Sequence, residues 1–557
     1  MGFLGVLETK SLPHVPATVH LNELGAENHH VTQGLKHGTG KNSHIVLVPQ
    51  PSEDPNDPLN WSYWKKLRIV LIVSLGACLY ASTFGPLLVA GAYQISQELG
   101  VTFTDVSLLA GYQLLVAGST GALVSALSRK WGKRPVFVFS ALFGLIGSIV
   151  GSVATSYSTL MGARVIQGFS TAAYESLTIA LVGDLFFVHE RGLYITISQF
   201  VLASVSNFSS VLTGPITSNL GWRYLFYLCV VIGGVQTLLL FLFCPETQFN
   251  RDHRYEIDES IGENLEDLAE IEKQHMVTST GPVGAKNERS EATHMEARVI
   301  PKKKTIVQEL ALVTGTYSSE NVVQLFIAPF ACCSNLVVLW AVVQSGTITA
   351  TYVAMSYVLA QIFAFPPYSL SAAGVGNLFL GPFLGGVIAS LVFGWINDPL
   401  IKWCSRKNNG VYEPEYRLLL MVPALVAGIG LMAFGKLAQD GASIYVTATM
   451  HGFVIFGITA ATISVCPYAL DAYRDMSSEI FVAGIIYKNF LFYGFSYFVN
   501  NWTATAGPTT VFYVFGGVVF GLMATTLLVF FFGKKYRALW ARNNLMEKMH
   551  IRTHAEI

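Results

Sequence analysis

The chain has 557 residues, of which 52% are hydrophobic and only 13% are charged, and its mean hydropathy is +0.47. A soluble domain carries about 25% charged residues, so this composition predicts a membrane protein and not a large soluble core. The 35 basic and 35 acidic residues cancel, so no overall field points to a nucleic-acid partner.

The first 66 residues are predicted to be a largely disordered cytoplasmic segment. They are polar up to about residue 50 and contain no early apolar run of the kind found in a cleaved signal peptide. The following stretch DPNDPLNWSYWKKLR, residues 54–68, has prolines that oppose helix formation. Its residues Trp61 and Trp64 suit a membrane interface.

Twelve apolar runs follow, each close to the roughly 20 residues that cross about 30 Å of hydrocarbon. Backbone groups in lipid have to be satisfied internally, so an all-α protein with twelve transmembrane helices is expected. Six runs form an N-terminal half, residues 67–244, at 67–91, 105–127, 136–154, 160–183, 193–216 and 223–244. Six more form a C-terminal half, residues 331–533, at 331–357, 372–395, 417–437, 443–467, 478–500 and 509–533.

The polar regions fix the expected topology. Residues 245–330 are predicted to be a linker, acidic at first and ending in the run PKKK, and residues 534–557 are predicted to be a tail. Lys and Arg concentrate in cytoplasmic loops. Alternate loops carry them here, at Lys65, Lys66 and Arg68, at Arg129 to Arg134, at Arg191, at Lys402, Arg406 and Lys407, at Arg474, and at Lys534, Lys535 and Arg537. This alternation predicts that both termini and the linker are cytoplasmic.

The seven cysteines suggest no disulfide framework and no metal site. Five of them lie inside apolar runs, at Cys78, Cys229, Cys332, Cys333 and Cys466. We therefore expect reduced core cysteines, no bound metal and no cofactor.

The loop between the second and third apolar runs reads SRKWGKRPV, residues 128–136. It resembles the G-x-x-x-D-R-x-G-R-R motif of the major facilitator superfamily through Gly132, Lys133 and Arg134, whereas Arg129 stands where that motif has Asp. The Asp of the motif normally makes a charge interaction with a helix. In the second half, GWIND (394–398) retains the acid of this pattern at Asp398. The resemblance implies a gating role for these residues.

Other stretches resemble the same superfamily. ARVIQGF (163–169) resembles its fourth-span motif, with Arg164 at the key position and Gly168 after it. The fifth run resembles the antiporter motif G-x-x-x-G-P-x-x-G-G through Gly214 and Pro215. Three further landmarks are typical of fungal members, namely PETQFNR (245–251), EPEYRL (413–418) and GKKYRALWAR (533–542).

From about residue 50 to the C-terminus the chain is thus similar to fungal drug:proton antiporters of twelve spans, and some landmarks recur in fungal polyamine and cation importers. The resemblance implies two pseudo-symmetric halves with a substrate site between them near the membrane midplane.

Three ionisable residues stand inside predicted spans, where a charge is a functional hypothesis by default. Arg164 and Glu175 lie within about 20° of one helix face and about 16 Å apart along the axis, with Gly168 between them. This stripe is expected to face a substrate cavity or, alternatively, to form a close helix contact. Lys488, about 15 Å deep, is expected either in a polar cavity beside Asn489 or snorkelling to the span end.

Glu175 is our candidate for the proton-responsive group, with Arg164, Lys488 and Asn489 as its companions. Gln113, Asn207 and Gln344 are expected to hydrogen-bond either a substrate or a neighbouring helix. Asn501 begins the sequon Asn-Trp-Thr and is a candidate for glycosylation.

No HExxH, GxSxG or P-loop motif occurs in the sequence, so neither an enzyme nor an ATP-driven pump is expected. The first and seventh runs contain no carboxylate, which favours export of a neutral or weakly charged hydrophobic compound, such as a secondary metabolite or drug, in exchange for protons. The alternatives are import of polyamines or other cations and a non-transporting sensor.

The expected partners are the substrate, protons and the bilayer, and no nucleic acid is expected. The protein is expected to be a monomer in the plasma membrane or, alternatively, in the vacuolar membrane.

Overall fold

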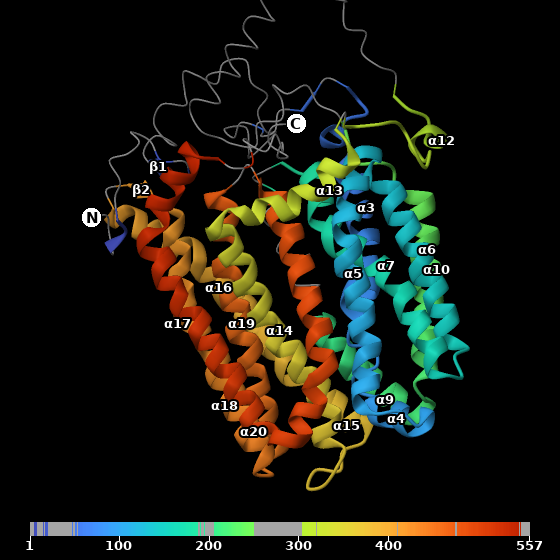
Figure 1. The fold of residues 1–557 in the computed structure, drawn as a ribbon. Coiled ribbons are helices and arrows are strands. Elements are labelled where there is room, and N and C mark those ends of the chain that lie inside the picture. Colours follow the sequence, from blue (N-terminus) through green and yellow to red (C-terminus); the bar gives the residue numbers. More distant parts are fainter. Residues whose placement is uncertain are drawn as a thin grey trace, which may run out of the picture.

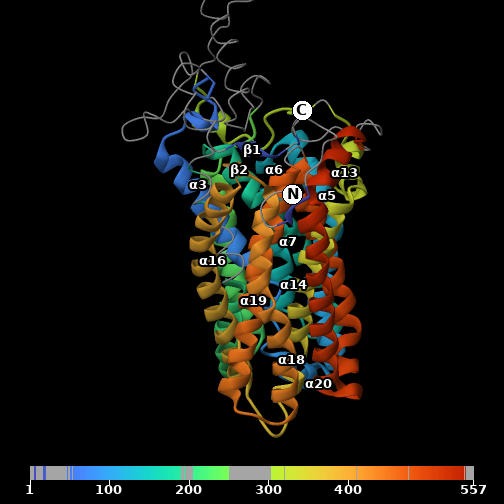
Figure 2. The same cartoon turned by 90° about the vertical axis from the view of Figure 1, so that its left-hand side faces the viewer.

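The computed structural model describes residues 5–7, 15, 17–20, 47, 51–52, 54–187, 190, 194, 205–249, 303–318, 320–408, 410–473, 476–544 and 546. These residues are almost entirely helical. Figure 1 shows the helices running side by side, with the blue-to-green elements of the N-terminal half next to the yellow-to-red elements of the C-terminal half. The view from the side in Figure 2 shows the same elongated bundle.

The helices of the N-terminal half follow the predicted apolar runs closely. They are η3 (Pro58–Asn60), α3 (Tyr63–Gly76), η4 (Ala77–Thr83), α4 (Ala92–Leu99), α5 (Phe103–Trp131), α6 (Lys133–Ser152), α7 (Tyr157–Leu185), α9 (Ser206–Leu220) and α10 (Arg223–Phe243). The predicted run 193–216 lies partly outside the described residues, which resume before α9.

The first predicted span needs a correction. Instead of one helix over 67–91, α3 continues as the π-helix η4 and residues 84–91 form turns. Gly85 and Pro86 stand at this break, and proline removes a backbone donor that a helix requires. Short π-helical stretches occur frequently at functional sites.

The remaining elements belong to the linker, the C-terminal half and a two-stranded sheet. They are β1 (Val19–His20), α12 (Ile306–Glu309), α13 (Val322–Ala331), η7 (Cys332–Ser334), α14 (Leu336–Phe363), α15 (Ala372–Asn377), α16 (Leu380–Lys407), β2 (Val411–Tyr412), η8 (Pro414–Leu420), α17 (Met421–Ala424), α18 (Val426–Gln439), α19 (Ile444–Ala472) and α20 (Ser477–Arg542). The strands β1 and β2 pair antiparallel.

Among the described residues, nine helical segments are long and apolar enough to cross a membrane. One of these, α20, has 66 residues and joins two helices across Gly507, whose φ of 80° and ψ of 156° are not helical. The predicted runs 478–500 and 509–533 fall on either side of this break. The helices α7 and α9 are not among the nine segments, so the expectation of twelve spans stays a prediction.

The basic loops collect at one end of the bundle. This end carries β1, β2 and α12, and α4 and α15 lie at the opposite end (Figure 1). The loop between α5 and α6, the C-terminus of α16 and the C-terminus of α20 all lie at the first end, as the alternation of basic loops requires.

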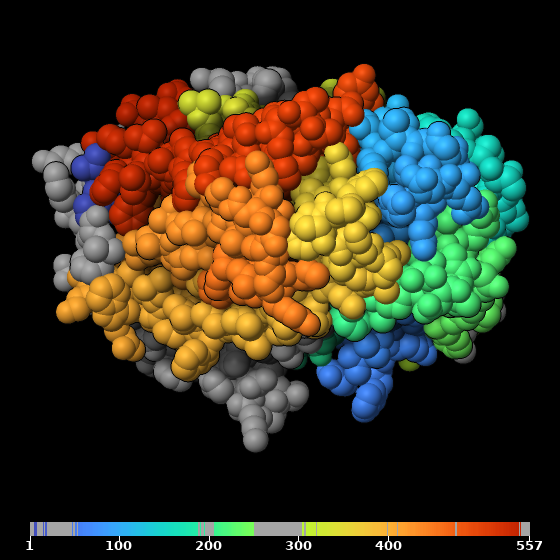
Figure 3. Space-filling model, turned by 90° about the horizontal axis from the view of Figure 1, so that it is seen from below, coloured from blue at the N-terminus to red at the C-terminus, as the bar shows by residue number. Residues whose placement is uncertain are grey.

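The two halves pack closely because small residues line their contacts. On α5, a Cβ at Gly111 would lie 2.0 Å from the hydroxyl oxygen of Ser496 on α20, and one at Gly118 would lie 3.0 Å from the Cβ of Asn489. Near the opposite end, a Cβ at Gly214 on α9 would meet the Ala372 carbonyl oxygen on α15 at 2.7 Å. The buried apolar core continues through both halves, and Figure 3 shows them adjoining at the lower face.

Gly507 provides a direct test of the break in α20. Its backbone conformation is accessible almost exclusively to glycine, so we expect Gly507→Ala to lower stability by about 1–3 kcal/mol. The measurement is thermal unfolding of the purified protein in detergent. Gly517→Ala is the matched control, because a Cβ there meets no atom within 4 Å and its φ is ordinary; equal melting temperatures for both variants would contradict the expectation.

Candidate functional site

An ion pair joins the two halves midway along the bundle. Glu175 on α7 pairs with Lys488 on α20, and the Nδ2 of Asn489 donates a hydrogen bond of 3.0 Å to the second carboxylate oxygen of Glu175. The two charged side chains remain partly accessible, at 15% for Glu175 and 28% for Lys488. Three residues predicted separately from the sequence are thus brought together around one carboxylate.

The depth of this cluster follows from helix geometry. Glu175 lies about 15 Å from the end of α7 at Leu185, and Lys488 lies about 16 Å from the start of α20 at Ser477. The Lys488 ammonium therefore meets a partner at its own depth instead of reaching back to the helix end. A paired charge avoids most of the desolvation cost of an isolated charge in a low-dielectric interior.

Arg164 lies elsewhere. Its guanidinium is fully buried and donates to Oε1 of Gln167 at 2.8 Å and to the carbonyl oxygens of Phe84 and Gly85 at 2.5 and 3.3 Å. These carbonyls belong to the turn that follows η4, so Arg164 satisfies backbone acceptors freed by the break in the first span. The structure does not join Arg164 to Glu175.

The small residue between these two charges makes a helix contact. A Cβ at Gly168 would lie 2.5 Å from the carbonyl oxygen of Gln113, so α7 and α5 approach closely there. The side chain of Gln113 donates to Thr171 at 3.0 Å in the same contact. The close-contact alternative therefore describes this part of the stripe better than a cavity wall.

The other predicted polar residues have distinct neighbours. Asn207 on α9 accepts a hydrogen bond from Tyr352 on α14 and so links the two halves. Gln344 donates to Thr526 at 2.9 Å, which is a contact within the C-terminal half. Asn501 accepts from Thr104 at 3.2 Å. Pro215 lies inside α9, and the side chain of Asp398, on α16, lies outside the described residues.

The loop Gly132–Arg134 is held by the carboxylate of Glu246, which the sequence analysis did not name as a candidate residue. Glu246, in the landmark PETQFNR, accepts hydrogen bonds of 3.0 Å from the backbone N–H groups of Lys133 and Arg134. Gly132 has a φ of 96°, and a Cβ there would lie 2.2 Å from Glu246. Burial raises the pKa of Glu246, while backbone hydrogen bonds, including those from Gln248 and Lys133, act in the opposite direction.

The two basic side chains of this loop bind within the N-terminal half and the linker. Lys133 pairs with Asp184 at the end of α7. Arg134 donates to the carbonyl oxygens of Phe241 and Ala311, each at 2.9 Å. The loop therefore fastens α5 and α6 to the ends of α7 and α10, and the gating role that the resemblance implied stays a prediction.

Arg129 is the member of the basic cluster that crosses between halves. Its guanidinium binds Glu479 in the first turn of α20 at 2.9 Å, and the two side chains are only 13% and 1% exposed. Sequence reasoning missed Glu479. The available signal was an acid at the start of the eleventh run, opposite an arginine that replaces the usual Asp.

A two-halved helical membrane bundle with paired charges at its centre and at one end defines a multi-pass membrane transport protein. Comparison with known protein families identifies the family of transporters. The profile of the Major Facilitator Superfamily matches residues 71–474, and the chain belongs to this family.

Individual relatives support the assignment. The chain is 27% identical to an uncharacterized MFS-type transporter of Schizosaccharomyces pombe, with 96% of each chain covered. It is 26% identical to Citrate exporter 1 of Aspergillus niger over 63% of this chain and 61% of that protein. The fold is similar to the partially occluded inward-open xylose transporter XylE from E. coli, with a TM-score of 0.52, 14% identity, and 83% and 99% of the two chains covered.

The pair between Arg129 and Glu479 can be tested by exchanging its charges. Arg129→Glu places two acids together, so we expect it to destabilise this end of the interface and to change transport severalfold. The double variant Arg129→Glu/Glu479→Arg is expected to recover most of the loss, with a coupling energy of about 0.5–3 kcal/mol. The measurement is a double-mutant cycle on thermal stability and transport rate; additive effects of the two substitutions would contradict a direct contact.

Proposed function

We propose that the protein is a proton-coupled secondary transporter that exports a small hydrophobic organic compound. The observation that carries the proposal is the ion pair between Glu175 and Lys488, which is partly accessible, lies midway along the bundle and takes one charge from each half. Residues of this kind inside membrane spans typically mark substrate or proton pathways.

In the proposed cycle, Glu175 exchanges a proton between its carboxylate and the accessible space beside it. The ionised carboxylate holds Lys488 and Asn489 and thereby draws the two halves together at the centre. Protonation removes the charge that holds the ammonium, so the contact weakens and the halves are free to change their arrangement. Substrate that enters beside the pair favours loss of the proton to one side, and reprotonation from the other side resets the carrier.

The balance of charge at this cluster supports a neutral or weakly charged substrate. Glu175 is already matched by Lys488, so a polycation would have to displace the lysine and would find a single carboxylate. Import of polyamines or other cations is for this reason the second candidate. Export agrees with the name of Citrate exporter 1, one of the relatives, although citrate itself is a different chemical class.

The proposal includes twelve spans, with the end that carries β1, β2 and α12 in the cytoplasm. Glycosylation of Asn501 would then occur at the opposite face, where Thr104 binds this residue. The proposed location is the plasma membrane, with the vacuolar membrane as the alternative, and the proposed working unit is a monomer.

The topology is tested with single epitope tags at the N-terminus, in the linker near residue 280, and at the C-terminus. We expect all three tags to be accessible only after the membrane is permeabilised. A tag at the loop between α18 and α19, near Gly441, is the control and should label on intact cells. Labelling of the linker tag on intact cells would overturn the orientation.

The proton-carrier role is tested by Glu175→Gln, which preserves the shape and the hydrogen bond from Asn489 but removes titration. We expect this variant to bind and exchange substrate and to lose accumulation driven by a pH gradient, by at least about tenfold, a factor equivalent to 1.4 kcal/mol. The measurement is efflux from vesicles with and without an imposed gradient.

The matched control is Glu98→Gln, which changes a surface pair with Arg223 at the far end of the bundle. An unchanged pH dependence of transport in Glu175→Gln would leave Glu175 a structural residue. Loss of substrate exchange as well would instead show that the carboxylate binds the substrate.

A further inference from the structure

The N-terminal segment lies against the C-terminal half. We define the N-terminal strap as the described residues 5–7, 15 and 17–20. Val6 and Val15 are 1% and 5% exposed, and Val6 packs with the apolar core of the bundle. The backbone N–H of Leu7 donates to the carbonyl oxygen of Phe531 on α20 at 3.1 Å.

The strap also extends the small sheet at this end of the bundle. Val19 pairs with Tyr412, and His20 pairs with Val411, in antiparallel register. Thr18, directly before this strand, is 9% exposed, and its hydroxyl donates to Oε2 of Glu413 at 3.0 Å. Backbone pairing, apolar burial and a side-chain hydrogen bond therefore hold the strap at separate points.

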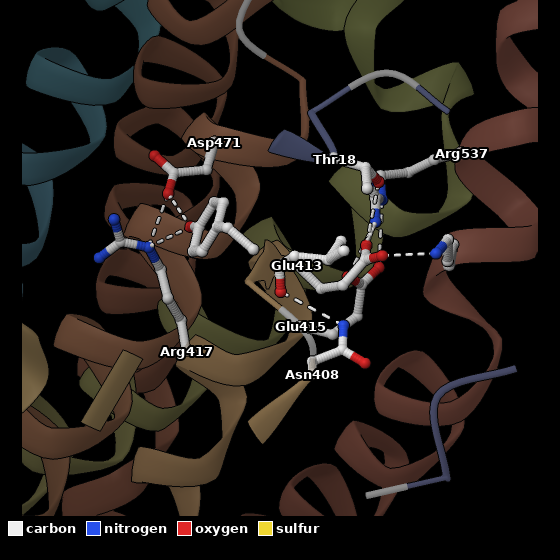
Figure 4. Close-up of polar contacts among 10 residues, drawn as sticks. Thr18, Asn408, Glu413, Glu415, Arg417, Asp471 and Arg537 are labelled. Carbon is white, nitrogen blue, oxygen red and sulfur yellow. Dashed lines mark hydrogen bonds and ion pairs between the residues drawn. The ribbon is translucent and has the colours of Figure 1, made fainter. Parts of the chain in front are cut away.

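Thr18 completes a buried ionic cluster that Figure 4 shows in close-up. Arg537 donates to Glu413 at 2.8 Å and to Glu415 at 2.9 Å, and all three side chains are no more than 1% exposed. Lys534 pairs with Glu413 at 2.5 Å. Two of the sequence landmarks, EPEYRL and GKKYRALWAR, meet here, and the strap covers the point at which they join.

We infer that the strap is a releasable brace of the C-terminal half and that Thr18 is its release point. With an uncharged hydroxyl at this position, the strap ties β2 and the start of η8 to the end of α20 and shields their ion pairs from water. A negative charge on the Thr18 side chain detaches it. This inference is independent of the proposed transport mechanism.

The charge balance of the cluster explains why a negative charge on Thr18 would detach the strap. Glu413 and Glu415 already bind Arg537 and Lys534. The Thr18 hydroxyl donates to Glu413 at 3.0 Å, and it accepts from Arg537 only at 3.5 Å, from a guanidinium that both carboxylates already neutralise. An acidic group at residue 18 loses that donor and places like charges in contact within a buried site. Phosphorylation is the modification of this chemistry: a kinase moves the terminal phosphoryl group of ATP to Oγ1, the hydroxyl proton leaves, and about −1.5 to −2 charges are added.

The strap can be trapped by a disulfide. Antiparallel partners have Cα atoms about 4.5–5.5 Å apart, which suits a disulfide, so His20→Cys with Val411→Cys is expected to cross-link in membranes under mild oxidation. A protease site inserted in the linker near residue 280 lets the cross-link be scored on a non-reducing gel, because only linked halves stay together after cleavage. Each single-cysteine variant is the background control.

In the variant with His20→Cys and Val411→Cys, adding Thr18→Glu is expected to slow cross-linking by at least about tenfold. The reason is that the hydrogen bond from Thr18 to the Glu413 carboxylate is replaced by a repulsion between two carboxylates. Thr18→Ser keeps the hydroxyl and should cross-link at the parent rate. Ser62→Glu is the matched charge control, because Ser62 is exposed at the same end of the bundle and its side chain caps nothing.

A further variant keeps the test decisive if Thr18→Glu folds poorly. Adding Glu413→Gln removes the repelling carboxylate and leaves the acid at residue 18 next to Lys534 and Arg537, so cross-linking should recover. Failure of the parent pair to cross-link would show that the strap is not docked. Cross-linking of Thr18→Glu at the parent rate would show that charge at Thr18 does not control it, and either result overturns the inference.

Discussion

The pairing of Glu175 with Lys488 joins the two halves at the middle of the bundle, where close helix contacts at Gly111 and Gly118 bring them together. Each half contributes one charge to the middle of the bundle, and neither half can leave its charge unpaired there without a large desolvation cost. The halves are therefore complementary electrostatically as well as in shape. In the transport cycle proposed above, a proton on Glu175 weakens this contact.

The contacts around this pair are of two kinds: contacts within each half, which make that half rigid, and contacts between the halves, which have to change if the halves move. Within the N-terminal half, Glu246 binds the backbone of the loop before α6 and holds it to the end of α10. Within the C-terminal half, Glu413 and Glu415 bind Arg537 and hold the corresponding loop to the end of α20. Both halves thus fasten the same kind of loop to their last helix through carboxylates, which favours motion of each half as one body. The contacts that cross between the halves include the two ion pairs at Arg129 and Glu175.

Much of this fold could be predicted from the sequence, because apolar length and the distribution of basic residues are strong local signals. The cluster of Glu175, Lys488 and Asn489 was predictable as a set of costly intramembrane residues, but their contact was not, since one residue of rotation about α20 would turn Lys488 away by about 100°. For Arg164 the predicted environment was wrong. Its charge suggested a substrate cavity, whereas its partners include the carbonyl groups that the break after η4 leaves without helical hydrogen bonds. Gly85 and Pro86 signal the break locally, but its contact with Arg164 is tertiary, and so is the contact of Gly168 with Gln113. The strap was missed because its polar composition resembles that of any disordered tail.

Arg129 stands where the family motif has an acid, and yet the two halves keep a charge contact at this end of the bundle. A carboxylate near the first turn of a helix is stabilised by the positive end of the helix dipole, by roughly 0.3–1 kcal/mol, whereas a guanidinium there is repelled. The guanidinium of Arg129, on α5, lies against the first turn of α20, where it is unfavourable unless that turn carries an acid. Glu479 is that acid, and it is almost completely buried against the guanidinium. In this chain the contact has its positive charge on α5 and its negative charge on α20, so the two halves meet through opposite charges at this end.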